Sequence, residues 1–249
     1  MALALSWHYG FLGIGFIAII IGVVSFILYK QPPQSVSLNI SEPVIPSSPR
    51  PSLREVFKGR DFWLVSSAGM FIVSVEFCAI TYFVLYLKEV LLFTVVTAGF
   101  FLAMLEASGA FGKPLAGLAS DRLFHGRRKK VYILMCCIAC AMCLIFAFLR
   151  QDSPSWIIIP LCLILGFVSI GWGGLHLTLI GEFAGKELAG TATATSSLFL
   201  MAGVIAGPPI FGYILDTTGS YQTAWLFLTI MAAVATALLL FSREDKRRI

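Results

Sequence analysis

Residues Gly112 to Lys130 read GKPLAGLASDRLFHGRRKK and form the one dense cluster of charge in a sequence that is otherwise almost continuously apolar. Five basic residues fall within nine positions, from Arg122 to Lys130, between two apolar runs. Short loops rich in lysine and arginine face the cytoplasm in membrane proteins. The stretch is therefore predicted to be a cytoplasmic loop, from which the apolar segments on either side alternate across a bilayer.

The composition supports this interpretation. Of 249 residues, 58% are hydrophobic and only 12% are charged, whereas about a quarter of the residues of soluble domains are charged. We therefore expect an all-α polytopic membrane protein whose main contact is the lipid bilayer. Strands of a membrane barrel would show alternating segments of about ten residues, and a nucleic-acid partner would need a basic soluble face. Neither pattern is present.

Seven apolar segments are each long enough to cross a hydrocarbon core of about 30 Å. They cover residues 9–29, 62–86, 94–118, 131–149, 156–181, 190–215 and 221–241. No basic residue precedes the first segment, which favours a spanning helix over a cleaved signal peptide. Residues 31–51 hold six of the eleven prolines and are predicted to be a linker.

These features divide the chain into three parts. A transmembrane helix occupies residues 1–29, a cytoplasmic linker residues 30–60, and a six-helix domain residues 61–249. Basic residues flank the linker and crowd the carboxyl terminus, so both are predicted to share the cytoplasmic side with the charged loop. Of the eighteen basic residues, only Lys88 and Arg150 then fall clearly outside.

The charged loop also carries a specific pattern. Gly117-x-x-x-Asp121-Arg122, followed by Gly126-Arg127-Arg128, resembles the signature loop Gly-x-x-x-Asp-Arg-x-Gly-Arg-Arg of the major facilitator superfamily. That loop joins the second and third helices of the family and again the eighth and ninth. Residues 123–125 replace the single residue that usually precedes the second glycine, a form that looks most like the organophosphate antiporters and their anion-transporting relatives.

Other stretches extend the resemblance over nearly the whole chain. Residues 7–11 and 31–36 are similar to the entry and exit of the family's sixth helix, and residues 207–221 to the corner between its eleventh and twelfth helices. The resemblance implies helices six to twelve, half of a twelve-helix transporter plus one helix, with the amino-terminal half as a missing partner. It further implies a secondary transporter for a small anionic organic solute, proton-coupled or working by antiport, in a bacterial inner membrane.

Ionisable groups inside the membrane are functional candidates, because each costs at least about 2.5 kcal/mol on insertion scales. Glu76 and Glu106 lie near the middles of their segments, at the depth where transporters bind solutes and coupling ions. Lys113 follows Glu106 by seven residues and shares its helical face. Two interpretations remain open: a packing seam of small residues that encloses a charge pair, and a cavity wall.

Trp172 and His176 complete the candidate binding residues. They lie with Ser169 in a glycine-rich part of one segment, which predicts a locally bent helix. Glycines that let helices pack closely are the alternative explanation.

The resemblance also assigns roles to individual positions. In the organophosphate antiporters the seventh helix carries a phosphate-binding arginine, and Glu76 stands at the matching place here, which reverses the local charge and argues against a phosphate ester. In the superfamily the charged loop latches one half of the protein to the other. The resemblance therefore implies that Asp121 is a gate residue held in place by Arg122.

Other classes are less well supported. Four cysteines at helical spacing, between Cys136 and Cys143, have no carboxylate or imidazole nearby in the sequence and are predicted to be apolar packing residues rather than metal ligands. A retinal protein would need a lysine within residues 221–241, which contain none. No enzyme activity and no cofactor are expected. A seven-helix sensor derived from the transporter family remains the alternative.

Overall fold

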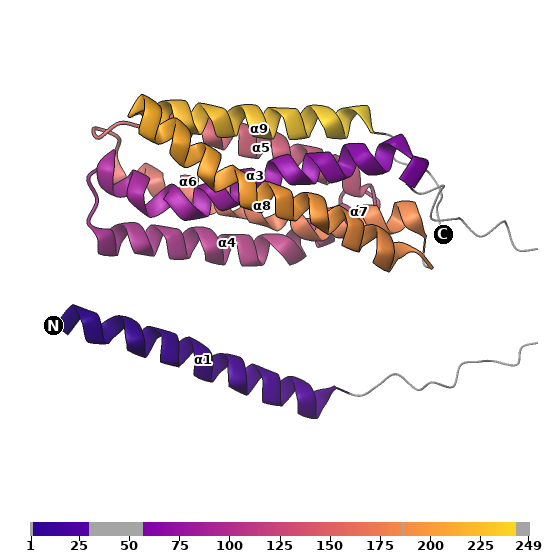
Figure 1. The fold of residues 1–249 in the computed structure, drawn as a ribbon, viewed down its shortest axis with the longest axis horizontal. Helices are drawn as coiled ribbons and strands as arrows, with labels where there is room; N and C mark the ends of the chain where they lie inside the picture. Colours follow the sequence, from indigo (N-terminus) through magenta and orange to yellow (C-terminus); the bar gives the residue numbers. More distant parts are fainter. Residues whose placement is uncertain (1, 30–56, 186, 243–249) are drawn as a thin grey trace, which may run out of the picture. The chain divides into compact units, whose positions relative to one another are not determined.

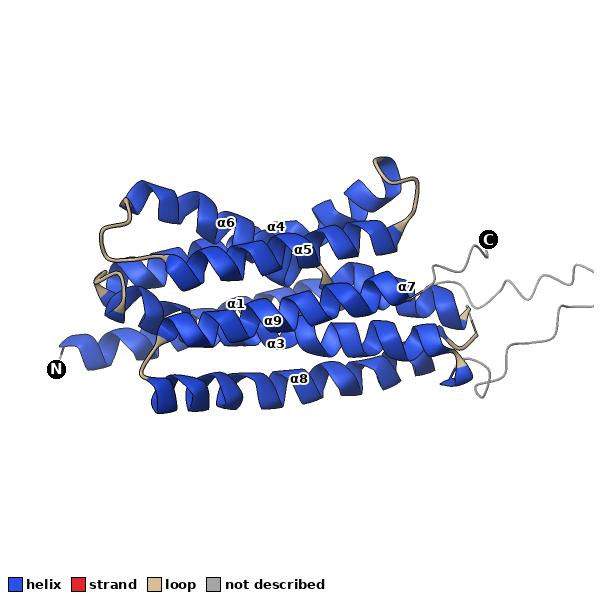
Figure 2. Cartoon of the chain, turned by 90° about the horizontal axis from the view of Figure 1, so that it is seen from above, coloured by secondary structure: helices blue, strands red, loops and turns tan. Residues whose placement is uncertain are grey.

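The computed structural model describes residues 2–29, 57–185 and 187–242, and of the side chains of residues 2–7 and 155 nothing is said. All the regular structure of these residues is helical (Figure 2). Most of the predicted linker and the last seven residues lie outside the described ranges. The chain divides into two units, residues 1–49 and 50–249, which we treat separately.

The first unit contains one helix, α1, Ala2–Leu28. Its side chains from His8 onward are exposed over their whole circumference within the unit, although the segment is the most apolar of the chain. An isolated helix with no polar face suits a lipid environment. The prediction of a spanning helix here is consistent with its length of 27 residues.

The second unit is a helical bundle in which successive spans run in opposite directions (Figure 1). Its helices are α3 (Arg60–Glu89), α4 (Val95–Arg122), α5 (Arg128–Phe148), α6 (Ser155–Gly171), α7 (Gly173–Ala184), α8 (Ala189–Thr218) and α9 (Tyr221–Phe241). Because α6 and α7 together make one span, this unit has six helical spans long and apolar enough to cross a membrane, and α1 is the seventh among the described residues. Each contains most of one segment predicted from the sequence.

Local sequence explains where several helices begin and end. Thr94 and Ser220 cap α4 and α9, and each side-chain oxygen accepts a hydrogen bond from a backbone N–H in the first turn. Gly219 ends α8 in the left-handed conformation, with a φ of 63° that glycine adopts without a steric penalty.

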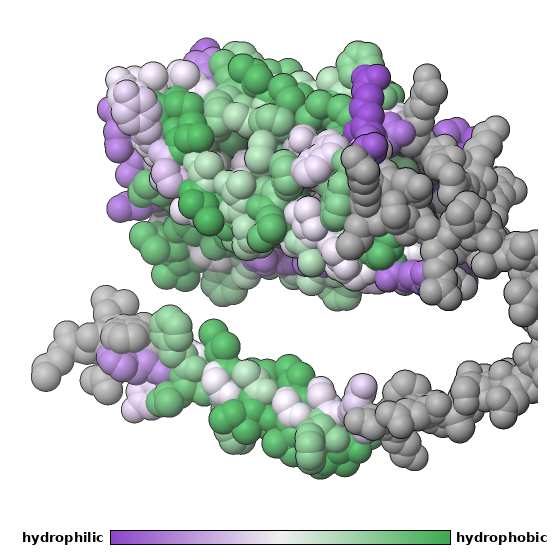
Figure 3. Space-filling view, turned by 45° about the vertical axis from the view of Figure 1, so that its right-hand side comes forward, coloured by the Kyte–Doolittle hydropathy of each residue, from purple (hydrophilic) through white to green (hydrophobic). Residues whose placement is uncertain are grey.

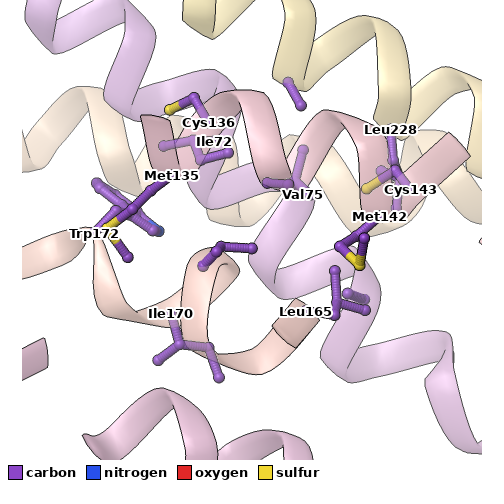
Figure 4. Close-up of a cluster of buried hydrophobic side chains, with 14 of the residues drawn as sticks. Ile72, Val75, Met135, Cys136, Met142, Cys143, Leu165, Ile170, Trp172 and Leu228 are labelled. Carbon is purple, nitrogen blue, oxygen red and sulfur yellow. The ribbon is translucent and has the colours of Figure 1, made fainter. Parts of the chain in front are cut away.

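The core of the bundle is apolar and draws side chains from α3, α5, α6 and α9. Figure 4 shows part of it, with these residues labelled: Ile72, Val75, Met135, Cys136, Met142, Cys143, Leu165, Ile170, Trp172 and Leu228. In Figure 3 hydrophobic side chains cover much of the outer surface and many of the hydrophilic ones lie toward the ends. This distribution is the one expected where lipid, rather than water, surrounds the bundle.

Helices α8 and α4 are the least buried of the bundle, followed by α9. Within the most apolar window of each span, 17% of α8 and 28% of α4 is buried, against 50% for α3 and for α5. Large apolar side chains on α4 and α8, among them Phe111 and Ile205, are about 70% exposed. Both helices therefore present a long open face.

Candidate functional site

Glu76 is held by a residue from another helix. It lies near the middle of α3, and its Oε2 accepts a hydrogen bond of 3.1 Å from Nε1 of Trp172. The same indole N–H is also directed at the backbone oxygen of Ser169, at 2.6 Å. An indole donates one hydrogen and accepts none, so the two oxygens share it and the carboxylate has a fixed orientation.

Trp172 lies between α6 and α7, where the span is interrupted. The glycine-rich sequence predicted a local bend, and the break falls at this residue, flanked by Gly171 and Gly173. A side chain on Gly171 would approach the backbone of Gly112 in α4 to 3.0 Å. The span is therefore interrupted at the same place where its backbone packs closely against α4. The indole itself is 2% exposed, so Trp172 supports the carboxylate from behind.

Glu106 and Lys113 lie on α4 and are both exposed. Glu76 is within electrostatic range of both, of Lys113 with opposite charge and of Glu106 with the same charge. Gly109 and Gly112 form the packing seam instead, since a side chain on either would collide with α6. The packing seam of α4 therefore does not enclose the charged pair. Glu106 and Lys113 lie on the open face of the helix instead.

His176 does not line that face. It is fully buried, and its Nε2 lies 2.9 Å from Oγ of Ser196 in α8, while its Nδ1 lies 3.4 Å from the hydroxyl of Tyr132 in α5. The Ser196 hydroxyl also accepts a hydrogen bond of 3.0 Å from Ser66 in α3. The sequence-based candidates Glu76, Trp172 and His176 therefore come together, but His176 belongs to a polar layer behind the site.

Sequence reasoning missed Tyr132. Its ring lies parallel to the Trp172 ring, with centroids 5.8 Å apart and an interplanar angle of 6°. In the sequence Tyr132 is an aromatic residue at the start of an apolar helix beside a basic cluster, a place where interfacial tyrosines are common. Only its full burial, which the sequence does not reveal, identifies it as part of this layer.

The charged loop forms a tight turn between α4 and α5. His125 and Gly126 both have positive φ, 54° and 74°, and the three residues 123–125 provide the length for this turn. Among the described residues, the cation beside Asp121 is Arg128, at 3.6 Å, and not Arg122 as the resemblance implied. Arg128 also bonds Glu182 in α7, with Nε 2.5 Å from Oε1. Arg128, the first residue of α5, thus ties the end of the loop to α7.

Several other residues of the loop motif have open surroundings. Arg122 and Arg127 are exposed, and a side chain added at Gly117 would meet nothing within 4 Å. Asp121 is 58% exposed, which leaves its carboxylate accessible to a further partner.

The site has a definite chemical capacity. Glu76 and Glu106 can take up and release protons, and Lys113 can pair with an anion. Two carboxylates near the middle of their spans and one lysine further toward the carboxyl end of α4 make a polar patch among apolar side chains. Of the predicted packing cysteines, Cys136 and Cys143 are buried in the apolar core and Cys137 is exposed.

Comparisons with known proteins agree on one family. The profile of the Major Facilitator Superfamily matches residues 1–208. A probable hexose phosphate transport protein of Chlamydia pneumoniae is 29% identical over 187 residues, which cover 72% of this chain and 39% of that protein. A probable galactarate/D-glucarate transporter of Escherichia coli is 29% identical over 178 residues, which cover 68% and 38%.

A solved structure extends the comparison to the fold. The fucose:proton symporter of Escherichia coli matches with a TM-score of 0.65 at 18% identity, covering 80% of this chain and 48% of that one. The chain thus spans about two fifths of the length of these two relatives and half that of the symporter.

Proposed function

Because the chain belongs to the Major Facilitator Superfamily, we propose that it forms the carboxyl-terminal half, with one preceding helix, of a secondary transporter that works by alternating access. The carboxylate pair and lysine near the middle of the span carry this proposal. Solute and coupling-ion sites of such transporters lie near the bilayer midplane, between two repeats. The midplane charges of this chain occupy the corresponding depth.

The proposed partner is a second group of helices that covers α4 and α8. These are the two least buried helices of the bundle, and Glu106 and Lys113 are exposed on α4. A partner there would enclose the patch and exclude lipid from it. The relatives are nearly twice as long as this chain, which supports such a partner.

The proposed solute is a small organic anion. Lys113 offers a cation to it, while Glu76 provides an acidic group in place of the arginine that the resemblance to organophosphate antiporters would predict. A dianionic phosphate ester next to two carboxylates is electrostatically unfavourable. Galactarate and glucarate, named for one of the relatives, are also dianions, but their two charges lie at opposite ends of a six-carbon chain and not on one group, so they fit this patch better than a hexose phosphate.

Proton coupling follows from the same residues. A carboxylate that binds a proton together with the solute removes one negative charge from the patch and so reduces repulsion of the anion. Ionisable residues within a span commonly have this role in transporters. We propose Glu76 and Glu106 as the proton sites, in a bacterial inner membrane with the linker and the carboxyl terminus in the cytoplasm.

The test uses the transporter assembled from this chain and its proposed partner half in proteoliposomes. Glu76→Gln and Glu106→Gln should abolish accumulation of labelled glucarate driven by a proton gradient and leave counterflow exchange intact. Glu89→Gln is the matched control, because Glu89 lies at the end of α3, away from the patch.

Equal loss of accumulation and exchange in both midplane variants would contradict the proton role. Binding of glucarate without any flux in the unchanged protein would favour the sensor instead.

A further inference from the structure

A buried polar layer lies behind Glu76 and links four helices. It consists of Ser66 in α3, Tyr132 in α5, His176 in α7 and Ser196 in α8, and each of these side chains is fully buried. Buried polar side chains are retained where they are hydrogen-bonded, and here each one bonds another member of the layer. None of them lines the open face of α4 or α8.

The ring of His176 is fixed on several sides. Its two nitrogens face the hydroxyls of Tyr132 and Ser196. A side chain added at Gly69 would lie 2.5 Å from Cε1 of His176, so α3 packs directly on the imidazole. The ring therefore has little room to rotate or shift.

The layer contacts Trp172 through its rings. His176 meets the indole edge to face, with centroids 5.6 Å apart and an angle of 80°, and Tyr132 lies parallel to it on another side. His176 and Tyr132 also meet each other edge to face, at 6.0 Å. Three rings in mutual contact hold the indole in one orientation, the one in which its N–H reaches Glu76.

That orientation needs support. The indole N–H already has an acceptor in its own turn, the backbone oxygen of Ser169 at 2.6 Å, and the bond to Glu76 is the longer one, at 3.1 Å. A small rotation of the ring would keep the short bond and lose the long one. The neighbouring rings oppose this rotation.

The layer is not a proton path to Glu76. Hydroxyl and imidazole groups both donate and accept hydrogen bonds, so the four side chains can exchange protons among themselves. Tyr132 is within electrostatic range of Glu76, but in the described part of the chain the hydrogen bond that reaches the carboxylate from this side comes from the indole N–H of Trp172, which donates but does not accept. The Trp172 indole therefore lets the layer affect where the Glu76 contact is made, but it does not carry a proton to the carboxylate.

We infer that Tyr132, His176 and Ser196 are positioning residues for the site: they hold Trp172 on Glu76 and make this contact depend on the position of α8. The inference rests on the role proposed above for Glu76. Ser196 belongs to α8, the least buried helix of the bundle. A displacement of α8 withdraws the Ser196 hydroxyl, releases His176 and loosens the hold on the indole.

The test measures the Trp172 indole proton by 15N-resolved NMR of the whole chain in detergent or nanodiscs, with Trp172→Phe to assign the signal. Tyr132→Phe and Ser196→Ala should each move the resonance upfield, toward its position in Glu76→Gln. Exchange of the proton with solvent should accelerate by about two- to tenfold, as expected for the loss of one net hydrogen bond.

Two matched controls separate positioning from stability. Tyr86→Phe removes a buried tyrosine hydroxyl that bonds the backbone of Phe146, at 2.6 Å, near the opposite end of the bundle. Ser74→Ala removes a hydroxyl that joins α3 to the backbone of Gly203 in α8 without touching His176. Neither should change the Trp172 signal, whatever it does to the melting temperature.

The inference is overturned if the signal stays unchanged in Tyr132→Phe or in Ser196→Ala, or if the controls move it equally. This measurement needs neither a solute nor transport. Loss of the proposed function of Glu76 would appear only in the flux experiment, so the two failures can be told apart.

Discussion

Gly166 offers the sharpest test of the packing that supports the site. A Cβ at this position would lie 2.0 Å from the backbone oxygen of Leu105 in α4 and 2.8 Å from its carbonyl carbon. Ordinary contact begins at 3.4 Å, so α6 and α4 would have to separate by about 1.4 Å in Gly166→Ala. Backbone atoms cannot move aside as the end of a flexible side chain can.

The loss of stability in Gly166→Ala can be estimated by comparison with a matched variant, Gly99→Ala. Gly99 lies on α4 in open space, where a Cβ would meet nothing within 4 Å. Both changes gain the same preference of alanine over glycine in a helix, about 1 kcal/mol. The difference between the two variants is therefore the steric cost, about 1–3 kcal/mol for overpacking. Gly166→Ala should thus melt about 2–12 °C below Gly99→Ala, on the usual scale for chains of this size.

Thermal unfolding in detergent, followed by circular dichroism and by monodispersity after heating, measures this difference. The Trp172 indole signal gives a second readout, since α6 ends at Gly171 and its displacement moves the indole away from Glu76. Equal melting temperatures for the two variants would show that α4 and α6 do not approach as closely as the structure has them, and the reasoning would fail.

Three further outcomes are expected. Cysteines introduced at Leu123 and Gln151, exposed residues at opposite ends of α5, should react with an impermeant maleimide from opposite sides of the membrane, and reaction from the same side would refute the topology. Asp121→Asn should change the free energy of unfolding of this chain by less than about 1 kcal/mol, because the Asp121 side chain is 58% exposed and its oxygen lies 3.6 Å from Arg128; strong destabilisation would make Asp121 a structural residue and not a latch. Leu92→Gly should raise the free energy of unfolding by up to about 1 kcal/mol, because Leu92 is exposed with a φ of 57° that glycine tolerates, and an unchanged melting curve would show that this turn is not strained.

The spans could be predicted from sequence because hydropathy acts residue by residue. Within lipid, the backbone N–H and C=O groups of each segment must form hydrogen bonds inside its own helix, so a long apolar run was sufficient to identify a span. The break near Trp172 was also predictable, from the glycines that surround it. For the same reason Glu76 and Glu106 could be found as charges at mid-span.

The partnerships between helices could not be predicted in this way. The bond from Trp172 to Glu76 joins residues 96 positions apart, and no periodicity within one helix indicates which face of another it meets. Tyr132 was missed for this reason. The pairing of Asp121 with Arg128 instead of Arg122 depends on how the turn at Gly126 folds back, which the loop motif alone does not specify.

Helix α4 carries two interleaved sets of positions. Leu105, Gly109 and Gly112 face α6 and admit little change in size, while Glu106 and Lys113, each one step further along the chain, are exposed. Under the proposed function, substitutions at the second set would change the charge and shape offered to a solute at little cost in helix packing. The same helix could then be adapted to chemically different solutes by changes at a few exposed positions, while the packed positions between them stay fixed.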